Sequence, residues 1–472
     1  MTVPLMGAIL FPLCFLLWAK PDRMLGLLLV AGVFPAASAL TLGSVCLQPS
    51  LVPGLAFISY VVLQKLLGAR YPGQDAASRL CGPMMLATGW ALVGSIVMPR
   101  LFRNQVHVWP QKQDLVGGQV LLTPTFGNIS QDTYLLLNVL LMVLAAQYLT
   151  RWQVKLSRLY YAYLAAGWLV VVLCVWQFGS RVGGLPFPKT FFYSNTGWAV
   201  LDNQMAGPVP RINATFSEPS ACASYLAGIL FSTVWVTLKG YKVRFSRLLI
   251  AASALGMCLT TSTTGFAAVA VGALLMPIMV VATGAARLLG RIGQLAMICA
   301  VLLGVGGLAV ATFSPHTVES AQMIASSTAE KKNSVSYQER SQADADSLTA
   351  FAETYGLGVG WGSNRSSSLI PGLLATVGAV GVICLAVFDW RLMKSAAWAL
   401  RAAPGSPETM VVEGVMAALA GRLTAACISG PTIGLPDFYV LIAVAIAAIV
   451  RVQMLSRATS VAVPVGALIA AE

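Results

Sequence analysis

The sequence contains little charge. Only 10% of its 472 residues are Asp, Glu, Lys or Arg, whereas soluble domains contain about 25%. A surface with so few charges cannot face water throughout, which excludes soluble enzymes and disordered proteins. The remainder is strongly apolar, with 57% hydrophobic residues and a mean hydropathy of +0.77. This composition predicts a polytopic membrane protein.

Metal-binding and disulfide patterns are missing as well. The chain has two histidines, His107 and His316, which lie far apart in the sequence. The nine cysteines lie in or beside apolar runs, without the CxxC spacing of a metal site. We therefore predict no metal, no cofactor and no disulfide framework.

Thirteen apolar runs come close to the roughly 20 residues that a membrane-spanning helix needs. No stretch alternates with the period of two that a β-barrel strand requires, so only helices can satisfy the backbone. We predict an all-α bundle, one integral membrane domain over residues 1–472, with twelve or thirteen transmembrane helices. The lower number applies if the first run lies in the membrane interface. The runs lie at 3–19, 24–46, 50–68, 82–102, 133–150, 159–178, 217–237, 246–262, 265–285, 293–313, 368–388, 408–428 and 434–451.

The loops between these runs alternate in charge. Most of the 30 Lys and Arg residues fall in one set of loops, while the other set mixes basic and acidic residues. The positive-inside rule places the basic set in the cytoplasm and the other set outside. The net charge of +13 is therefore a topology signal, and no nucleic-acid partner is predicted. Three predicted outside loops are long, at 103–132, 181–216 and 314–366, and loops of that length are mostly functional or disordered.

The first polar motif, R-I-N-A-T-F-S-E-P-S, begins at Arg211 and leads into the run at 217–237. Ser217 is the predicted N-cap, and Pro219 suits the first helical turn. A helix N-terminus with an arginine just ahead of it is a candidate anion site. The alternative is that Arg211 anchors the chain to lipid phosphates while Glu218 neutralises the helix dipole.

The second motif lies in the loop at 314–366 and predicts a helix outside the membrane, from about 336 to 355. Tyr337, Arg340 and Asp344 recur on one face of it at helical spacing. An arginine on a packed face needs an anionic partner, and two interpretations are open. Arg340 binds a ligand, or it pairs with Asp344 one turn away.

The third motif, G-L-G-V-G-W-G-S-N-R-S-S-S, begins at Gly356 and enters the run at 368–388. Its four glycines permit positive φ angles or a close approach of the backbone to a ligand. The alternative is a tight turn between two helices. Trp361, Asn364 and Arg365 are the candidate ligand-binding side chains of this motif.

Several weaker features have structural alternatives. The hydroxyl groups of the Thr260–Gly265 hairpin can contact a sugar or simply turn the chain. Arg422 falls inside an apolar run, where a charge needs a partner, and Glu413 is the candidate. Some aromatic residues can stack on sugar rings or belong to an interfacial belt. These are Trp109, Phe187, Tyr193, Trp198 and Trp361.

Taken together and in this order, the motifs resemble the membrane O-antigen polymerase and O-antigen ligase superfamily. The resemblance lies in the R-x-x-A-T-F-S-E-P-S stretch, the Ser/Thr-rich hairpin, the large outside loop with its arginine, and the GLGVGWGSNRSSSL stretch. It covers residues 200–390 well, and the first 180 residues only in general layout. It implies an inverting, metal-independent, GT-C-like glycosyltransferase in the bacterial inner membrane, whose active face is periplasmic.

The resemblance also implies the substrate and the roles of the site residues. The substrate is a glycan carried on undecaprenyl diphosphate, and a chain-length regulator protein is a further expected partner besides the lipid bilayer. Arg211 and Arg340 are assigned to the diphosphate, and Glu218 to activation of the acceptor hydroxyl. Arg365 binds phosphate or the acceptor sugar. Ser217, Tyr337, Trp361 and Asn364 are the other expected substrate-binding residues.

Three functions remain in competition. A polymerase that joins repeat units into O-antigen, capsule or exopolysaccharide is favoured, because no histidine follows His316 and the ligases usually carry one near the glycine-rich stretch. An O-antigen ligase that transfers glycan to lipid A–core is the first alternative. A transporter of a polar lipid or glycan is the second, and Arg422 is the feature that fits it.

Overall fold

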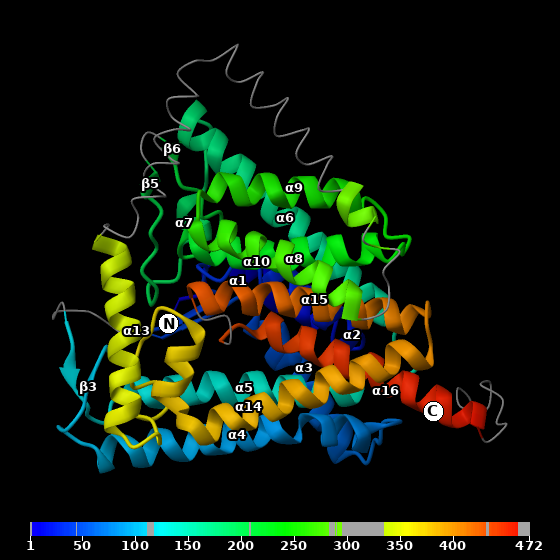
Figure 1. The fold of residues 1–472 in the computed structure, drawn as a ribbon, viewed down its shortest axis with the longest axis horizontal. Helices are drawn as coiled ribbons and strands as arrows, with labels where there is room; N and C mark the ends of the chain where they lie inside the picture. Colours follow the sequence, from blue (N-terminus) through cyan, green and yellow to red (C-terminus); the bar gives the residue numbers. More distant parts are fainter. Residues whose placement is uncertain are drawn as a thin grey trace.

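The protein is a bundle of long helices in the computed structural model (Figure 1). Residues 2–43, 45–110, 118–206, 209–282, 288, 290–294, 335–430 and 434–460 are described. The run predicted at 293–313, His316 and the first part of the predicted loop at 314–366 lie outside these residues, apart from the start of that run.

Most of the described helices are apolar and run side by side, which confirms the predicted all-α polytopic fold. Seven are long and apolar enough to cross a membrane: α4 (Gln74–Leu101), α5 (Phe126–Tyr148), α6 (Leu156–Gly183), α8 (Pro219–Leu238), α14 (Leu369–Ala402), α15 (Pro407–Ile428) and α16 (Pro436–Ser460). In four further helices the apolar stretch is shorter, at 10–17 residues: α1 (Leu5–Leu16), α3 (Leu51–Leu66), α9 (Ser246–Thr260) and α10 (Thr263–Ala282).

The remaining described elements are small or polar. The helices are α2 (Pro21–Ala31), α7 (Lys189–Phe192) and α13 (Val335–Glu353). The strands are β1 (Leu40–Leu42), β2 (Val45–Leu47), β3 (His107–Val108), β4 (Val120–Leu121), β5 (Met205–Ala206) and β6 (Val209–Pro210). They form three antiparallel hairpins, in which Leu40 lies opposite Leu47, His107 opposite Leu121 and Met205 opposite Pro210.

The prediction of a spanning helix at 24–46 is wrong. Helix α2 ends at Ala31, and the chain then turns into the β1–β2 hairpin. Gly32 follows the helix, and Pro35 disfavours a helical conformation for the residue before it. A side chain at Gly32 would also meet the Asp437 Cβ at 2.9 Å, so α2 ends where α16 comes closest.

Helix α16 forms the centre of the bundle. Every residue from Tyr439 to Val450 is at most 3% exposed, because α16 packs against α15, α5, α14, α4 and α2. The neighbouring helix α15 packs against α8, and α8 packs against α9. An apolar helix that is buried all round marks the core of a helical bundle. The start of α16 is therefore held in place by packing, and it fixes the positions of the residues around it.

The two ends of the bundle differ. Helices α13 and α7 and the hairpins β3–β4 and β5–β6 gather at one end, where α13 runs across the ends of the long helices (Figure 1). We call this the loop end. The loops predicted to lie outside the membrane meet there, although they are far apart in the sequence.

At the opposite end, which we call the basic end, Arg451 of α16 donates to the Leu149 and Val154 carbonyls, and Lys239 pairs with Glu413 at 3.2 Å. Two loops from the predicted cytoplasmic set are held there, so the alternation of charge along the sequence corresponds to the two ends of the fold.

Candidate functional site

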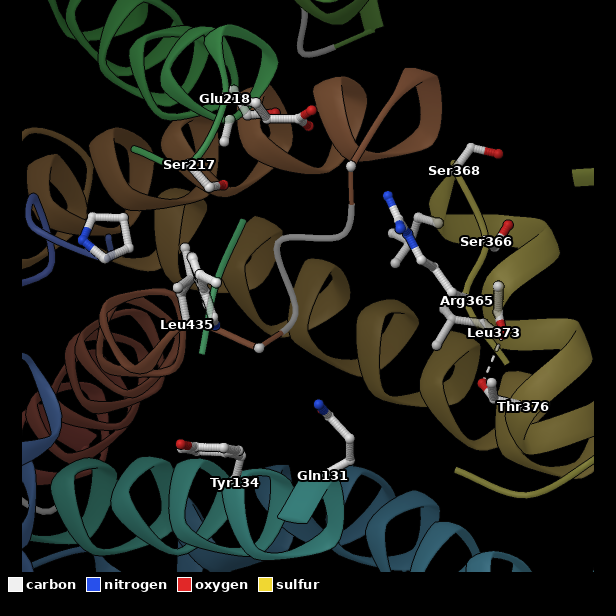
Figure 2. A pocket seen from close by; sticks show the side chains of 18 of the residues that line it. Gln131, Tyr134, Ser217, Glu218, Arg365, Ser366, Ser368, Leu373, Thr376 and Leu435 are labelled. Atoms are coloured by element: carbon white, nitrogen blue, oxygen red, sulfur yellow. Dashed lines mark hydrogen bonds between the residues drawn. The ribbon is translucent and has the colours of Figure 1, made fainter. Parts of the chain in front are cut away.

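A cavity of about 400 Å³ lies at the loop end, among α5, α8, α14, α15 and the start of α16. Figure 2 shows Gln131 and Tyr134 of α5 on one side of it, Ser217 and Glu218 on the opposite side, and Arg365 extending between them. Other polar residues that line it are Gln48, Ser224, Ser366, Ser368, Thr376 and Arg422. The first and third sequence motifs therefore meet around one cavity.

The segment ahead of α8 is held by buried amide groups. The Gln177 side chain accepts hydrogen bonds from the N–H groups of Asn213 and Ala214, at 3.1 and 2.7 Å. Asn213 in turn donates to the Phe216 carbonyl at 2.6 Å. Ala214 has a φ of +50°, a conformation that a side chain adopts at a cost. These bonds fix the backbone that presents Arg211 and Ser217.

Helix α8 begins one residue later than predicted. Glu218 is its N-cap and Ser217 stands just ahead, because Pro219 occupies the first helical position. No side-chain hydrogen bond caps this end. The Glu218 carboxylate is instead directed to its neighbours and accepts a short hydrogen bond from the Ser220 hydroxyl. The interpretation of Glu218 as a simple cap is therefore incomplete.

Arg340 of α13 pairs with Glu218 and not with Asp344. Its Nη2 lies 3.2 Å from Glu218 Oε2, and its Nη1 donates to the Ser429 hydroxyl at 2.5 Å. The local pair with Asp344, left open from the sequence, is not what the structure contains. Arg340 thus connects α13 with the start of α8 and the end of α15.

Arg211 lies close to this ion pair. Its Nε is buried and has no hydrogen-bond partner among the described residues. Burial lowers the pKa of the Arg211 guanidinium, the positive charge of Arg340 lowers it further, and the charge of Glu218 opposes this. Arg211 is therefore a desolvated cation beside a second one, which does not fit an anchor in lipid headgroups.

Asp344 holds the N-terminus of α14. Its carboxylate accepts from the N–H groups of Ser367 and Ser368, at 2.9 and 3.0 Å, and from the hydroxyls of Ser366 and Ser368, both at 2.6 Å. These bonds satisfy N–H groups that the helix itself leaves unpaired. The serines of the third motif are thereby fixed to α13, and Arg365 beside them is directed toward the cavity (Figure 2).

Arg365 differs from Arg340 because no described residue forms an ion pair or a side-chain hydrogen bond with it. Its backbone N–H donates to the Trp109 carbonyl at 2.9 Å, which fixes the position of the residue. A cation with a fixed backbone and an unpaired guanidinium is able to bind an anion in the cavity.

Gly358 and Gly360 of the third motif pack against protein backbone, whereas Gly362 lines the cavity. Gly356, Gly358, Gly360 and Gly362 all have φ between +78° and +94°. A side chain at Gly360 would lie 2.7 Å from the Gly94 carbonyl oxygen of α4. Helix α14 is interrupted beside them at Gly378, with φ +63° and ψ −171°.

Backbone carbonyls just before the interruption accept hydrogen bonds from the glycine-rich segment. The N–H groups of Val359 and Gly360 donate to the Ala375 and Thr376 carbonyls, at 2.7 and 3.1 Å. This pairing is a close backbone approach of the kind that glycine permits, and it supports a structural role for Gly358 and Gly360.

The other predicted binding residues occupy different positions. Ser217, Trp361 and Asn364 line the cavity, whereas Tyr337 is an exposed residue of α13 that is not among the lining residues. The Asn364 side chain is buried, accepts from the Trp109 N–H at 2.9 Å and donates to Ser347 at 2.9 Å. Asn364 therefore organises the loop end of the bundle.

The suggested partner of Arg422 is wrong. Arg422 pairs with Asp437 at 2.6 Å, and Glu413 pairs with Lys239 at the basic end. Nine residues are two and a half helical turns, which places Glu413 and Arg422 on opposite faces of α15. The partner comes from the first turn of the next helix, α16.

The weaker candidates have local structural roles. The Thr260 hydroxyl donates to the Met257 carbonyl, within the last turn of α9. Trp109 donates to Asp346, Phe187 packs on Trp176, and the Tyr193 hydroxyl donates to the Ala214 carbonyl. Trp198 and Trp361 do line the cavity. No group of three His, Cys, Asp or Glu in the described part of the chain is arranged to hold a metal ion.

The sequence does not predict one wall of the cavity or two long-range hydrogen-bond contacts made by α13. Gln131 and Tyr134 form that wall, and they lie in the first turns of an ordinary apolar helix, so no motif distinguishes them. Ser429 bonds to Arg340 across 89 positions, and Asp344 reaches the serines of the third motif across 22 to 24. The Ser-Ser-Ser run after Arg365 is the sequence feature that could have indicated the contact with Asp344.

Comparison with family models and with curated proteins gives no match for this chain. The geometry of the cavity and the motif resemblance are therefore the features that bear on the function of this chain.

Proposed function

We propose that this chain is a membrane glycosyltransferase that polymerises oligosaccharide repeat units carried on undecaprenyl diphosphate. In this proposal it works at the periplasmic face of the bacterial inner membrane and makes O-antigen, capsule or exopolysaccharide. The main support is a group of three arginines near Glu218, which lines the cavity: Arg365 lines the cavity too, Arg340 pairs with Glu218, and Arg211 lies close to that pair. The sequence motifs that carry the family resemblance supply the same residues.

The charge balance around the cavity favours a diphosphate. Arg365 in the cavity wall, and Arg211 and Arg340 close to it, are accompanied by one free carboxylate, Glu218, because Asp344 is committed to the N-terminus of α14. This leaves two positive charges, equal in number to the negative charges of a lipid diphosphate sugar. Guanidinium groups bind phosphate oxygens bidentately and remain charged. Arg211, with a buried Nε that lacks a partner, is the group with most to gain from an anion.

The proposed reaction transfers a glycan from the diphosphate to a hydroxyl group. The acceptor oxygen forms a bond with the anomeric carbon of the donor while the bond from that carbon to the phosphate oxygen breaks. The electron pair of the broken bond stays on the diphosphate, and the acceptor proton passes to a base. Arginines that stabilise the negative charge of the leaving diphosphate would accelerate the reaction. In comparable sites one such donor changes kcat about 100- to 1000-fold.

Glu218 is the proposed base, and its ion pair gives it a second role. In the absence of substrate its carboxylate serves as the counter-ion of Arg340. A diphosphate that binds Arg340 competes with Glu218 and frees the carboxylate to accept a proton. Glu218 lines the cavity, so it is within reach of an acceptor bound there.

One assay tests the proposal. Purified protein is mixed with lipid-linked repeat units isolated from the producing cells, without metal or nucleotide, and the products are separated by size. A ladder of polymer is expected. Transfer to added lipid A–core without a ladder would identify a ligase, and movement of the intact glycolipid across vesicles without any covalent product would identify a transporter.

Variants connect the assay to the site. Arg211→Ala, Arg340→Ala and Arg365→Ala are expected to abolish most of the ladder and to leave single repeat units on the lipid. Arg181→Ala is the matched control, because Arg181 pairs with Asp202 at 3.5 Å, whereas Arg340 pairs with Glu218 and Arg211 lies near that pair. Equal activity of the four variants and the wild type would refute the assignment of the arginines.

A further inference from the structure

The cavity continues inward along one face of α8. Glu218, Ala221 and Ser224 line it at steps of three residues, and Tyr225 lies four residues after Ala221, so all four lie on one side of the helix. At about 1.5 Å per residue, Ser224 and Tyr225 lie about 10 Å deeper than Glu218. Arg422 of α15 lines the cavity with them. The inner end of the cavity is thus formed by three polar residues that the proposed reaction does not use.

Each of these residues carries a polar atom that no described residue satisfies. The Ser224 hydroxyl, the Tyr225 hydroxyl and Arg422 Nε are buried without a hydrogen-bond partner in the described part of the chain. The three side chains are at most 3% exposed. A buried polar group without a partner is costly, and such groups are rare in folded proteins. Three of them along one cavity wall indicate a site that is completed by a ligand.

The charge of this inner end differs from that of the outer end. Arg422 is neutralised by Asp437 at 2.6 Å, so the group has no net charge, whereas the arginines near Glu218 leave an excess of positive charge. An additional anion is therefore not favoured here. The unpaired atoms are two hydroxyl groups, which both donate and accept, and one N–H donor. Aromatic rings of Phe216 and Tyr225 line the same region.

We propose that Ser224, Tyr225 and Arg422 form a subsite for a neutral, hydroxyl-rich group, namely a sugar residue of the glycan, separate from the diphosphate site at Arg211, Arg340 and Arg365. This inference rests on the proposed function and specifies where one part of the substrate lies. Sugar hydroxyls supply the donors and acceptors that the three residues lack, and an aromatic ring packs against the apolar face of a sugar.

The test measures binding with two probes on the full chain in lipid nanodiscs. The first probe is the free oligosaccharide, released by mild acid from the isolated lipid-linked repeat unit, and the second is inorganic pyrophosphate. Ser224→Ala and Tyr225→Phe each remove one hydroxyl and little volume. Each is expected to weaken oligosaccharide binding about three- to tenfold, the effect of one hydrogen bond, and to leave pyrophosphate binding unchanged.

Matched controls remove the same chemistry elsewhere. Ser253→Ala and Tyr71→Phe each delete a buried hydroxyl that also lacks a partner among the described residues, and neither residue lines the cavity. Both are expected to bind the oligosaccharide as the wild type does. An equal loss in the controls would mean that the effect is a general loosening of the bundle and would overturn the subsite.

The outcomes separate this inference from the proposed function. Suppose that polymer forms but that Ser224→Ala and Tyr225→Phe bind the oligosaccharide normally. The subsite is then wrong and the polymerase stands, and the same holds if polymer forms but the wild type does not bind the oligosaccharide. If the two variants lose oligosaccharide binding but no transfer product forms under any condition, the sugar subsite stands and the polymerase is wrong.

Discussion

Two ion pairs beside the cavity differ sharply in their surroundings. Arg422 and Asp437 are each 1% exposed and lie 2.6 Å apart, whereas Arg340 and Glu218 are 38% and 25% exposed and lie 3.2 Å apart. The first pair joins two adjacent helices inside the bundle, and the second joins α13 to the start of α8. A fully buried pair is difficult to separate, because each residue would then carry an uncompensated charge inside the protein. A partly exposed pair separates at little cost.

The comparison identifies which cations are free to meet a ligand. At the basic end, Arg451 is buried but donates to the carbonyls of Leu149 and Val154, so its charge has a structural use. At the loop end, Arg211 keeps a buried Nε without a described partner, and Arg340 has a partner that an anion can replace. Burial alone therefore does not distinguish Arg451 from Arg211, whereas the hydrogen bonds of their guanidinium groups do.

The largest expected effect comes from breaking the buried pair. Asp437→Ala leaves Arg422 charged and unpaired in the core, which costs about 3–5 kcal/mol of the free energy of unfolding. Denaturant unfolding in detergent measures this. Replacing both residues with apolar ones (Arg422→Met with Asp437→Leu) is expected to recover most of the loss, since no charge is then left unpaired. If Asp437→Ala is as stable as the wild type, the pair is not structural.

The next effect is on activity and not on stability. Arg211→Ala is expected to lower the polymerisation rate about 100- to 1000-fold, the loss typical of one donor at a developing charge. Its thermal stability should be equal to or above that of the wild type, because a desolvated cation is removed. Arg181→Ala, on the same end of the bundle, is expected to retain both. A large loss of stability in Arg211→Ala would place this arginine in the structural class with Arg422.

Asp344→Ala is expected to have a smaller effect. The carboxylate orients the backbone next to Arg365, so its loss should raise the KM for the lipid-linked substrate about tenfold while kcat changes less, in line with charge-assisted hydrogen bonds of about 1.5–3 kcal/mol. Asp344→Asn keeps an acceptor for the two N–H groups and is expected to recover part of the affinity. Glu339→Gln, an exposed position on the same helix, is the control. An unchanged KM in Asp344→Ala would show that Arg365 is held by other contacts.

Hydropathy and charge along the chain predict the fold well, because a membrane helix is defined by the polarity of its own residues. They fail at 24–46, where Gly32 and Pro35 lie inside an apolar run and the total hydropathy hides them. The segments that surround the cavity are also predictable, since Arg211, Glu218 and Arg365 lie in polar motifs.

The pairing of charges is much harder to predict from the sequence. Local spacing suggested Asp344 for Arg340 and Glu413 for Arg422, but the partners are Glu218 and Asp437, on other helices. Which helices are neighbours is decided by packing around α16, and that information is not contained in the spacing of charged residues along one helix.

The smallest effect is the most discriminating. A double-mutant cycle on Arg340→Ala and Glu218→Ala measures their coupling in the free energy of unfolding, and we expect about 0.2–1 kcal/mol, which decreases as salt is raised from 0.1 to 1 M. We expect a weak pair because water reaches both side chains, and the proposed mechanism requires this weakness so that a diphosphate can displace Glu218. The Arg422–Asp437 pair, measured in the same way, should show a larger coupling that does not respond to salt. If the coupling of Arg340 and Glu218 is instead several kcal/mol and independent of salt, Glu218 is not exchanged for substrate, and a different group must accept the proton.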